Sequence, residues 1–477
     1  MSHVVICNWR DSGHPLAGGA ELYCERVAEH LTRNGHEVTL LTSGFKGATP
    51  VEEATFGRIV RRGGRFTVYF HTLVWLRRHR RQFDAVIDSQ NGIPFFSPLA
   101  TGRRKPVALL IHHVHQHQFT LYFPRPVSLL GQWLERTVSR WVYGRRAVCV
   151  VSPSSRAEVR RLLRFAGPVF ITACGQDRAD NPVRVLRDVH PRIVFVGRLV
   201  NHKRVDLLVR AFAEVMSRVE DLRLDIVGSG PELPALRTLA DQLQVGERIC
   251  FHGRVSDQRR DNLLDQAWMT VGTSVGEGWG LSVMEAAARG VPAVALRVSG
   301  LQDSVIDGVT GWLVNDPVDL PTAIVNAVAS LREDATARSM ADACRRWSDR
   351  FSWQATADRL LAVLTAERAR LHDGSVARRA EHVSDAATIV DLDPVGLRTA
   401  DLSVLPGTDQ IDLGADTARL LLLGADEEDA RARLTQMGVP TATIRDCRLA
   451  RPNELLGWAS SVADLSLTGA DGESGSS

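Results

Sequence analysis

Short apolar runs alternate with amphipathic segments along most of this chain, and the alternation starts at its first residues. VVICNW (4–9) is an apolar run typical of a strand buried on both faces. A polar loop follows, and then a segment that places Leu22, Val27 and Leu31 at helical spacing and ends at Asn34–Gly35. HEVTLLTS is the next apolar run. A strand, a helix and a strand in this order predict a βαβ unit, and therefore a parallel sheet.

The same alternation begins again near residue 192. Strands predicted over 192–198 (RIVFVGR) and 222–230 (LRLDIVGSG) flank a helix predicted over 205–219. We therefore predict an α/β fold with two doubly wound, Rossmann-like domains, residues 1–188 and 189–350, that meet in the polar stretch 177–191. The rest of the chain is predicted to form a helix over 351–370, a linker over 371–385, a small α/β appendage over 386–466 and a disordered tail over 467–477.

Charge is distributed unevenly along the chain. The net charge of +3 divides into +13 for residues 1–190, −1 for residues 191–370 and −9 for residues 371–477. A basic front indicates an anionic partner, which can be a phosphate group, an anionic membrane surface or nucleic acid. No recognised nucleic-acid-binding motif is present, so we do not expect a nucleic-acid partner.

Cysteine use and hydropathy exclude further classes. Seven cysteines without a CxxC pair argue against a disulfide framework or a structural zinc site, and favour a reducing compartment. No run approaches the roughly 20 apolar residues of a membrane-spanning helix. The first residues show no basic segment followed by an apolar one, as a secretion signal would. We expect a cytoplasmic protein.

Two segments carry the residues that anions bind. HPLAGGAE (14–21) places Gly18 and Gly19 at the entrance of the first helix, where free backbone N–H groups and the helix dipole favour an anion. GRLVNHK (197–203) places Gly197, Arg198 and Lys203 after a buried strand, at the end where open α/β sheets bind ligands. Two cations in one loop can hold a diphosphate. A flexible turn and a solvated basic loop would show the same patterns.

A third segment, GEGWGLSVMEAAARGVPAVA (276–295), combines acids with a glycine-rich turn. Glu277 precedes the turn, and Glu285 lies eight residues later on the predicted helix. Carboxylates accept hydrogen bonds from the vicinal hydroxyls of a ribose or another sugar. The two acids can thus address two parts of one ligand. Two surface acids beside a tight turn are the alternative.

Four histidines lie close together in HHVHQHQ (112–118), directly after the predicted strand VALLI. Alternation along an extended segment would place His113, His115 and His117 on one face, as in a metal site. The nearest acids are far away in sequence, so we favour a polar strand end that faces a cleft. A histidine there can bind a substrate hydroxyl or move a proton.

Two basic stretches and one acidic motif remain. Arginines accompany aromatic and aliphatic residues in 66–83 and again in 128–147, as in basic amphipathic helices that lie on an anionic membrane or pack on a core. DLD (391–393) is similar to the metal motif of another class of sugar transferase. It lies in a strand-like run outside the main domains, so we regard it as a coincidence.

Taken in their order and spacing, these segments resemble glycosyltransferase family 4, a family of retaining enzymes with the GT-B fold. The resemblance covers about residues 1–370. It rests on GGAE (18–21), GR with the later Lys203, VGSGP (227–231), FHGRV (251–255), the spacing of Glu277 and Glu285 with GVPAVA behind them, DGVTGWLV (307–314) and the closing FSW helix.

The resemblance implies two domains that face each other across a cleft, with the nucleotide sugar mainly on the second domain and the acceptor mainly on the first. It implies no metal and no other cofactor, because basic residues replace the metal at the diphosphate. Arg198 and Lys203 would neutralise the leaving diphosphate beside Gly197, and Gly18 and Gly19 would touch the phosphates from the other domain.

Further roles are implied for the nucleoside and the sugar. Glu285 would hold the ribose hydroxyls, and Val255 would line the donor site. Glu277 would hold the transferred sugar together with the backbone amides of Gly278, Trp279, Gly280 and Leu281. His112 or His113 would meet the sugar near its reacting face, and the sequence does not distinguish them.

The resulting hypothesis is a retaining glycosyltransferase that moves a hexosyl unit from a nucleoside-diphosphate sugar, without a metal, to a glycan, a lipid-linked or a small-molecule acceptor. A role in building a cell-envelope glycan, with peripheral attachment to the inner face of the cell membrane, would suit the basic stretches. The alternatives are an inactive scaffold that binds sugar nucleotide or a membrane, and a sugar-nucleotide epimerase of the same fold. Intact Glu277, Glu285, Arg198 and Lys203 argue against the scaffold.

Overall fold

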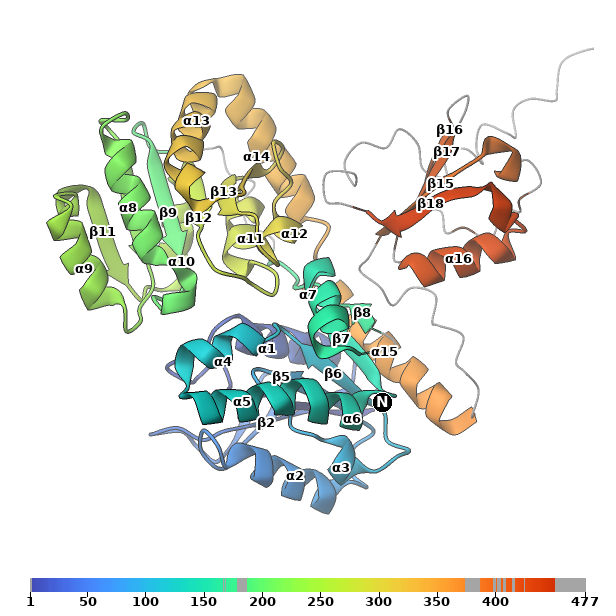
Figure 1. Ribbon diagram of the computed structural model, residues 1–477. Coiled ribbons are helices and arrows are strands. Elements are labelled where there is room, and N and C mark those ends of the chain that lie inside the picture. The colour runs from blue at the N-terminus through green and yellow to red at the C-terminus, as the bar shows by residue number, and fades with distance from the viewer. Residues whose placement is uncertain are drawn as a thin grey trace, which may run out of the picture.

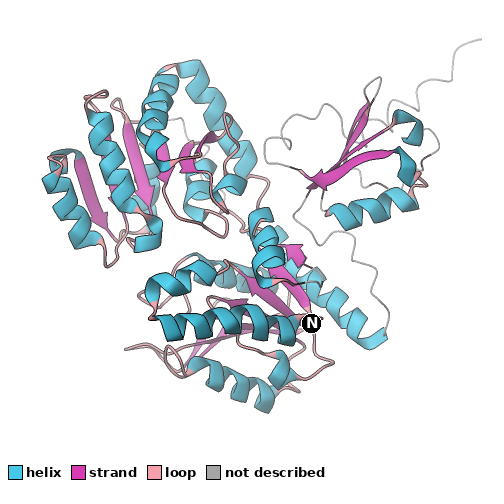
Figure 2. Cartoon of the chain, in the orientation of Figure 1, coloured by secondary structure: helices cyan, strands magenta, loops and turns pink. Residues whose placement is uncertain are grey.

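The computed structural model describes residues 2–165, 167, 169–177, 187–373, 387–397, 400, 405, 409–413, 417–423 and 425–450. Within these residues the strands form three separate sheets, with strand orders β3-β4-β2-β1-β5-β6-β7-β8, β11-β10-β9-β12-β13-β14 and β16-β17-β15-β18. The first two sheets are each covered by helices and face one another, and the third belongs to a smaller unit beside them (Figures 1 and 2).

The first domain is built on the eight-stranded sheet. Neighbouring strands are parallel except for the antiparallel pair β3–β4 at one edge. Its strands are β1 (His3–Cys7), β2 (Glu37–Thr42), β3 (Val51–Ala54), β4 (Gly57–Arg61), β5 (Ala85–Gln90), β6 (Val107–Ile111), β7 (Ala147–Val150) and β8 (Val169–Ile171). Its helices are α1 (Gly19–Arg33), α2 (Val68–His79), α3 (Pro98–Thr101), α4 (Gln116–Tyr122), α5 (Arg125–Trp133), α6 (Ser139–Tyr143) and α7 (Pro153–Glu158).

The second domain is built on the six-stranded sheet, which is parallel throughout. Its strands are β9 (Arg192–Val196), β10 (Arg223–Val227), β11 (Ile249–Gly253), β12 (Met269–Gly272), β13 (Ala293–Leu296) and β14 (Gly311–Val314). Its helices are α8 (Val205–Met216), α9 (Leu233–Gln242), α10 (Asp257–Asp265), α11 (Leu281–Ala288), α12 (Leu301–Ser304), α13 (Leu320–Arg332) and α14 (Asp334–Ser348). The central strands are apolar runs because helices bury both faces of the sheet.

The last helix of this part, α15 (Trp353–Asp373), returns to the first domain. It packs against α1, and its Thr356 hydroxyl donates to the carbonyl of Ala173 over 2.8 Å. Two segments therefore connect the domains, and they lie side by side: the amide of Gln176 donates to the carbonyl of Phe351 over 3.0 Å. A Cβ on Gly175 would lie 2.2 Å from the amide nitrogen of Trp353, so only a glycine fits at this crossing.

Apolar packing continues from one domain into the other. Trp279 and Trp347 of the second domain each contact Phe351 edge-to-face, with ring centroids 4.9 Å apart in both pairs. Both tryptophans belong to the same buried cluster as residues of β1, α1 and α15. Burial of such large aromatic side chains stabilises the junction by several kcal/mol, at about 25 cal/mol per Å² of apolar surface.

The appendage is an antiparallel sheet with one long helix against it. It comprises β15 (Ala387–Leu392), β16 (Gln410–Leu413), β17 (Ala418–Leu423), α16 (Glu427–Gln436) and β18 (Ile444–Leu449). Arg156 of α7 joins it to the first domain through Asp426 (3.2 Å) and Glu427 (2.9 Å). The predicted disordered tail and residues 374–385 of the predicted linker lie outside the described residues.

One of the two basic stretches is not the single helix that we expected. Residues 66–83 contain α2, but 128–147 divide into α5, a π-helical segment over Leu134–Val138 and α6. In the π-helical segment Glu135 is fully buried and accepts hydrogen bonds from the segment that follows β6. The wider turn occurs where this polar side chain is directed into the interior.

Candidate active site

The loops that carry the predicted site residues meet at the carboxyl ends of the two parallel sheets. The direction of the strand order reverses between β1 and β5 in the first sheet and between β9 and β12 in the second. Ligands of open α/β sheets bind at such points. Gly18 and Gly19 follow β1, Arg198 and Lys203 follow β9, and the 276–281 loop follows β12. The topology thus brings together segments that are far apart in the sequence.

Helix α1 begins at this edge with two glycines, as the anion hypothesis requires. Glu21 caps it by accepting from the amide of Gly18 over 2.8 Å, and Arg10 donates to the same buried carboxylate over 3.0 Å. The next amides, of Gly19 and Ala20, donate to no group that the structure describes. They are free donors at the positive end of a helix dipole.

The start of α11 lies against the start of α1. A Cβ on Gly19 would be 2.7 Å from Cδ1 of Leu281, and one on Gly18 would be 3.6 Å from Nε of Arg198. Gly280 precedes α11 in the left-handed region, with φ of 94°. The N-termini of α1 and α11, which belong to different domains, and the exposed Arg198 therefore surround one site. Such a place suits a ligand that carries more than one negative charge.

Lys203 and Glu277 form an ion pair with one another. The Lys203 ammonium and the Ser274 hydroxyl both donate to Oε1 of Glu277, the second over 2.5 Å. Burial opposes the charge of Glu277, but Lys203, the hydrogen bond from Ser274 and the neighbouring His113 together outweigh it and hold the pKa of this carboxyl below its usual value. The glutamate is thus ionised. We had assigned the lysine to the diphosphate and the glutamate to the sugar, and the structure places the two groups in direct contact.

The structure distinguishes the two adjacent histidines. His112 Nε2 is 2.9 Å from the Ser89 hydroxyl, its ring meets Tyr23 edge-to-face, and burial lowers its pKa to about 4. His113 instead faces the loop over residues 276–281, which we call the donor loop: its Cε1 is 3.6 Å from the Cβ position of Gly276. Its Nδ1 is buried and has no hydrogen-bond partner within the described part of the chain. His113 is therefore the histidine beside Glu277.

The metal-site alternative, with His113, His115 and His117 on one face of an extended segment, does not fit the structure. The segment after β6 is not extended, because α4 begins at Gln116 and carries His117 away as an exposed residue. His115 lies near Glu135 instead, with Nδ1 3.8 Å from Oε1. An acid twenty residues away in sequence thus lies beside this segment in the fold, and a local pattern gives no sign of such a contact.

The nucleoside side of the site contains Glu285 and Val255. Glu285 lies on α11, where burial raises its pKa to about 6 although Arg260 lies 3.8 Å away. Val255 follows β11 and packs on the apolar cluster that includes Ala286. The side chain of Trp279 is buried against Phe351, so only its backbone can meet a ligand.

Gly228, which faces Gly197, and Gly278 allow close backbone contacts. The amide of Gly197 donates to the carbonyl of Val227 over 3.0 Å, and a Cβ on Gly228 would lie 1.8 Å from the Gly197 oxygen. A Cβ on Gly278 would lie 2.0 Å from the carbonyl oxygen of His112, in the other domain. The donor loop therefore touches the first domain through its backbone.

Sequence reasoning missed several residues that shape this edge. Tyr122 OH is 2.7 Å from His202 Nδ1, and Arg254 donates to the carbonyl of Pro15 over 3.3 Å, so both link the domains. Arg10 braces Glu21 from within the first loop. The contacts between domains have no local signal, whereas the capping role of Glu21 could have been predicted from its position in the first turn of the helix.

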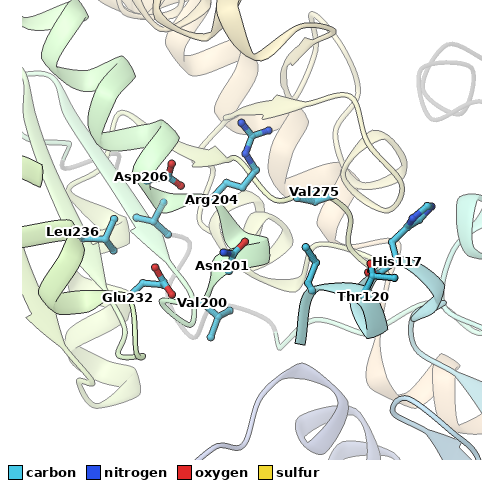
Figure 3. A pocket seen from close by; sticks show the side chains of 11 residues that line it. His117, Thr120, Val200, Asn201, Arg204, Asp206, Glu232, Leu236 and Val275 are labelled. Atoms are coloured by element: carbon cyan, nitrogen blue, oxygen red, sulfur yellow. The ribbon is translucent and has the colours of Figure 1, made fainter. Parts of the chain in front are cut away.

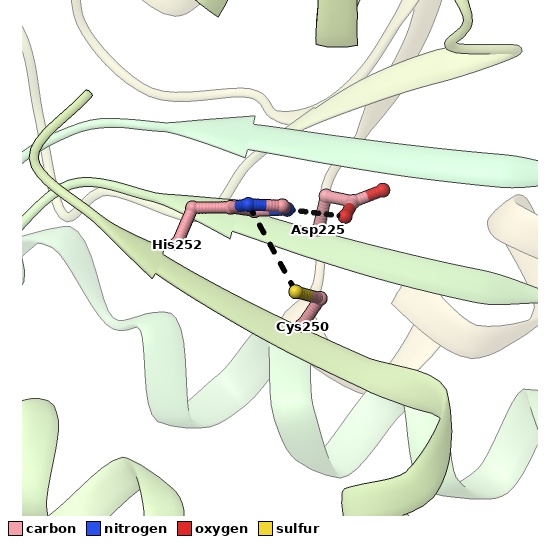
Figure 4. A group of neighbouring side chains, drawn as sticks. All are labelled: Asp225, Cys250 and His252. Atoms are coloured by element: carbon pink, nitrogen blue, oxygen red, sulfur yellow. Dashed lines mark hydrogen bonds and ion pairs between the residues drawn. The ribbon is translucent and has the colours of Figure 1, made fainter. Parts of the chain in front are cut away.

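Asp225, Cys250 and His252 form a group of the residue types that bind metals, on the neighbouring strands β10 and β11 (Figure 4). Asp225 accepts from Arg192 over 2.6 Å, and His252 Nε2 is 2.5 Å from its other oxygen. Cys250 Sγ is 3.9 Å from His252 Nδ1. Both carboxylate oxygens already have partners, so the group connects three strands. In the DLD motif, Arg419 occupies both oxygens of Asp391 in the same way.

Comparisons with known proteins agree with this geometry. The family described as Glycosyltransferase Family 4 matches residues 17–180, and the one described as Glycosyl transferases group 1 matches residues 177–349. A D-inositol 3-phosphate glycosyltransferase of Rhodococcus opacus is 35% identical over 387 residues, which cover 72% of this chain and 85% of that protein. A GDP-mannose-dependent alpha-(1-6)-phosphatidylinositol monomannoside mannosyltransferase of Mycolicibacterium smegmatis is 28% identical, covering 74% and 96%.

Solved structures share the fold. Sucrose-phosphate synthase of Thermosynechococcus elongatus superposes with a TM-score of 0.65 at 22% identity, over 79% of this chain and 100% of that chain. HepE of Anabaena, solved with UDP and glucose, superposes with a TM-score of 0.59 at 17% identity, over 76% and 100%. These likenesses confirm the predicted GT-B fold of two Rossmann-like domains facing a cleft.

Proposed function

Because this chain belongs to glycosyltransferase family 4 and is therefore a sugar-transferring enzyme, we propose that it moves a hexosyl unit from a nucleoside-diphosphate sugar to an acceptor hydroxyl, with retention and without a metal ion. The observation that carries the proposal is the meeting of the α1 and α11 N-termini beside Arg198. Backbone N–H groups, helix dipoles and a guanidinium together can bind the negative charge of a diphosphate.

In the proposed reaction the bond between the sugar C1 and the diphosphate oxygen breaks, and a bond from C1 to the acceptor oxygen forms on the same face. The acceptor proton passes to a diphosphate oxygen. Negative charge grows on the leaving diphosphate, where Arg198 and the free amides of Gly19 and Ala20 stabilise it. Donor binding would bring the Lys203 ammonium to the phosphates while its partner Glu277 accepts from sugar hydroxyls.

In this proposal His113 contacts the sugar of the donor, and Glu285 contacts its ribose. His113 faces the donor loop, and its unpartnered Nδ1 supports a contact with the sugar. Glu285 lies on the helix whose start binds the phosphates, which supports a contact with the ribose diol. The names of the relatives point to a GDP-mannose donor in one case and to inositol-bearing acceptors in both. For this chain we propose a hexose donor and an acceptor that carries several hydroxyl groups, as inositols and saccharides do.

The test is donor binding and slow donor hydrolysis across a panel of nucleotide sugars with EDTA present. We expect the wild type to bind and hydrolyse one donor, and Lys203→Ala to lose both activities. Lys46→Ala, which changes an exposed lysine far from the site in the sequence, should keep them. Dependence on an added divalent metal would contradict the metal-free mechanism. Failure of the folded protein to bind any donor would contradict the function.

We also propose that the first domain contacts an anionic membrane surface. The described residues include no helix that is long and apolar enough to cross a membrane. Phe70 of α2 and Leu129, Trp133 and Trp141 of the α5–α6 region are largely exposed, among arginines. Exposed aromatic side chains beside cations are typical of interfacial binding.

Vesicle flotation measures this contact. We expect binding to phosphatidylglycerol vesicles that weakens as salt rises, because screening reduces the attraction of the arginines. Phe70→Ser with Trp141→Ser should reduce binding, whereas Val318→Ser, which replaces an exposed apolar residue of the second domain, should not. Equal binding to neutral phosphatidylcholine vesicles, or none at low salt, would contradict the proposal.

A further inference from the structure

A cavity of about 550 Å³ is lined by residues of both domains (Figure 3). Its wall on the first domain is α4, and its other walls are the start of α8, the start of α9 and the loop after β12. The lining residues are His117, Thr120, Leu121, Val200, Asn201, Arg204, Val205, Asp206, Glu232, Leu236 and Val275. Its volume is in the range of small-ligand sites, about 300–1,000 Å³.

One wall of this cavity is the segment that holds the ion pair. Lys203 lies between the lining residues Asn201 and Arg204, and Glu277 follows Val275 by two residues. The amide of Val275 donates to the carbonyl of His202 over 2.9 Å, so the two loops form one continuous wall. Glu285 and Val255 do not line it. The cavity therefore adjoins the sugar end of the proposed donor site and not its nucleoside end.

The lining combines charged, polar and apolar groups. Arg204, Asp206 and Glu232 make no ion pair with any other described residue, and Asn201 adds an amide side chain. Leu121, Val200 and Leu236 add apolar surface. Carboxylates, a guanidinium and an amide bind hydroxyl groups, and aliphatic side chains cover the C–H faces of sugar rings. Because two carboxylates and only one guanidinium line the cavity, it does not favour binding of a phosphate group.

Arg204 has an unusual backbone conformation for its position in this wall. It precedes α8 in the left-handed region, with φ of 49° and ψ of 46°, where a glycine would be unstrained. Strain at a residue other than glycine persists where the side chain has a function or the surroundings impose it. Arg204 is one of the residues that line the cavity, which favours a function.

We propose that this cavity is an acceptor subsite on the second domain that binds the sugar units of an oligosaccharide acceptor next to the hydroxyl that reacts. The inference rests on the proposed glycosyl transfer and adds a substrate class to it: a saccharide chain longer than one unit. Binding would occur only with the domains together, because α4 and α8 belong to different domains.

The test compares acceptors of different length on the donor that the wild type hydrolyses. The probes are methyl α-mannoside, α-1,6-mannobiose, α-1,6-mannotriose and D-inositol 3-phosphate. We expect the wild type to prefer the longer saccharides. In Asp206→Asn with Glu232→Gln, the KM for mannotriose should rise about tenfold or more, while methyl α-mannoside transfer and acceptor-free donor hydrolysis stay within about twofold. Glu220→Gln, the same change at an exposed carboxylate elsewhere in the domain, should alter neither.

Arg204→Gly separates a binding role from a structural one. Glycine removes the backbone strain, so the variant should not melt below the wild type, yet its KM for mannotriose should rise. Equal KM values for all saccharides in the wild type and both variants would overturn the subsite, as would a preference for D-inositol 3-phosphate that the variants leave intact. If no donor is hydrolysed, the proposed function fails separately. The subsite is then decided by saturation-transfer NMR with mannotriose: binding lost in the double variant supports it, and binding unchanged or absent overturns it.

Discussion

At the scale of single residues, the site depends on glycines that let two backbones meet. Gly278 is the clearest case, because a Cβ there would lie 2.0 Å from the His112 carbonyl oxygen. That oxygen belongs to the backbone and cannot rotate away. At Gly276, two residues earlier, a Cβ would lie 3.6 Å from His113, an ordinary contact. The two positions differ in this respect although they belong to the same loop.

Gly278→Ala should therefore separate the donor loop from the first domain. We expect kcat/KM to fall about 100-fold, because displacement of reacting groups by about 1 Å costs that much. Gly276→Ala is the matched control and should keep most of the activity. Circular dichroism should show both variants folded, since each domain has its own core. Equal activity of the two variants would contradict the close contact as the reason for the glycine.

Glu285 should give donor binding a dependence on pH. Burial raises its pKa to about 6, so below that pH it is protonated and loses acceptor capacity for the ribose diol. Donor affinity of the wild type should fall as pH drops from 7.5 to 5.5, and Glu285→Gln should bind weakly with a flatter profile, measured by calorimetry.

The same residue should affect stability with a defined sign. A folded pKa above the unfolded one means that the wild type loses stability as pH rises from about 4.5 to 6. Glu285→Gln should thus be more stable than the wild type at pH 8, by about 1–2 kcal/mol, and equal to it near pH 4.5. A variant that is less stable at pH 8 would contradict the burial of this charge.

At the scale of elements, the segment from His112 to Tyr122 connects the histidines, the cavity and the second domain. Glu135 holds its centre, because its buried carboxyl accepts from the His115 amide over 2.7 Å and from Gln116 Nε2 over 2.6 Å. Gln90 donates to the same group over 3.1 Å. Burial raises the pKa of Glu135 to about 8. One side chain thus positions the start of α4.

Glu135→Ala should remove the hydrogen bonds that hold the start of α4. Loss of hydrogen bonds to buried donors should lower the free energy of unfolding by about 1–3 kcal/mol, measured by urea denaturation. Glu135→Gln is the matched control and should retain most of the contacts. Because the folded pKa is raised, the wild type loses stability between pH 4.5 and about 8, and Glu135→Gln should not show that loss. A Glu135→Ala variant as stable as the wild type would contradict the positioning role.

Some features of the fold and the site were predictable from the sequence, and others were not. The parallel sheets and the helix starts at Gly19 and Leu281 were predictable, because they depend on local patterns of apolar residues and glycines. The positions of Lys203, Glu277 and Glu285 after strands of the second sheet were predictable for the same reason, whereas their roles stay a prediction. The pairing of Tyr122 with His202 was not, because the two residues lie in different domains. The contact of His115 with Glu135 was not predictable either, because the two residues belong to different elements.

At the scale of the whole molecule, the appendage is joined to the part that carries the chemistry through α7. Arg156 of α7 holds Asp426 and Glu427 of the appendage. In the same helix Ser155 donates to the carbonyl of Gly278 over 3.3 Å, and the Ser154 amide donates to Asp303 over 3.0 Å. Helix α7 is therefore a junction of three units, and the appendage contacts it on the side of Arg156.

Truncation after Asp373 should leave both large domains folded, because nearly all of their core residues precede that point. Donor hydrolysis should remain within about threefold. The truncation removes the two acids that pair with Arg156 and uncovers its side chain, which is 13% exposed in the full chain, so that water replaces the acids.

Arg156→Leu should therefore have little effect on the truncated chain, whereas in the full chain it should lower the free energy of unfolding by about 1–3 kcal/mol, because the ion pairs with Asp426 and Glu427 are lost. The two changes are thus non-additive, as expected for groups in contact. The measurement is thermal unfolding of the four chains. Additive effects would indicate that the ion pairs do not connect the appendage to α7.

The paired crossing at Gln176 and Phe351 determines how the two domains can move. Because the two connecting segments are hydrogen-bonded to each other, they form one hinge between the domains. We therefore expect any relative motion of the domains to be a rotation about this crossing, beside Gly175. Opening of the cleft would then separate the helix starts, the cavity walls and the Gly278–His112 contact in one step, so that donor and acceptor sites are exposed or assembled as a unit.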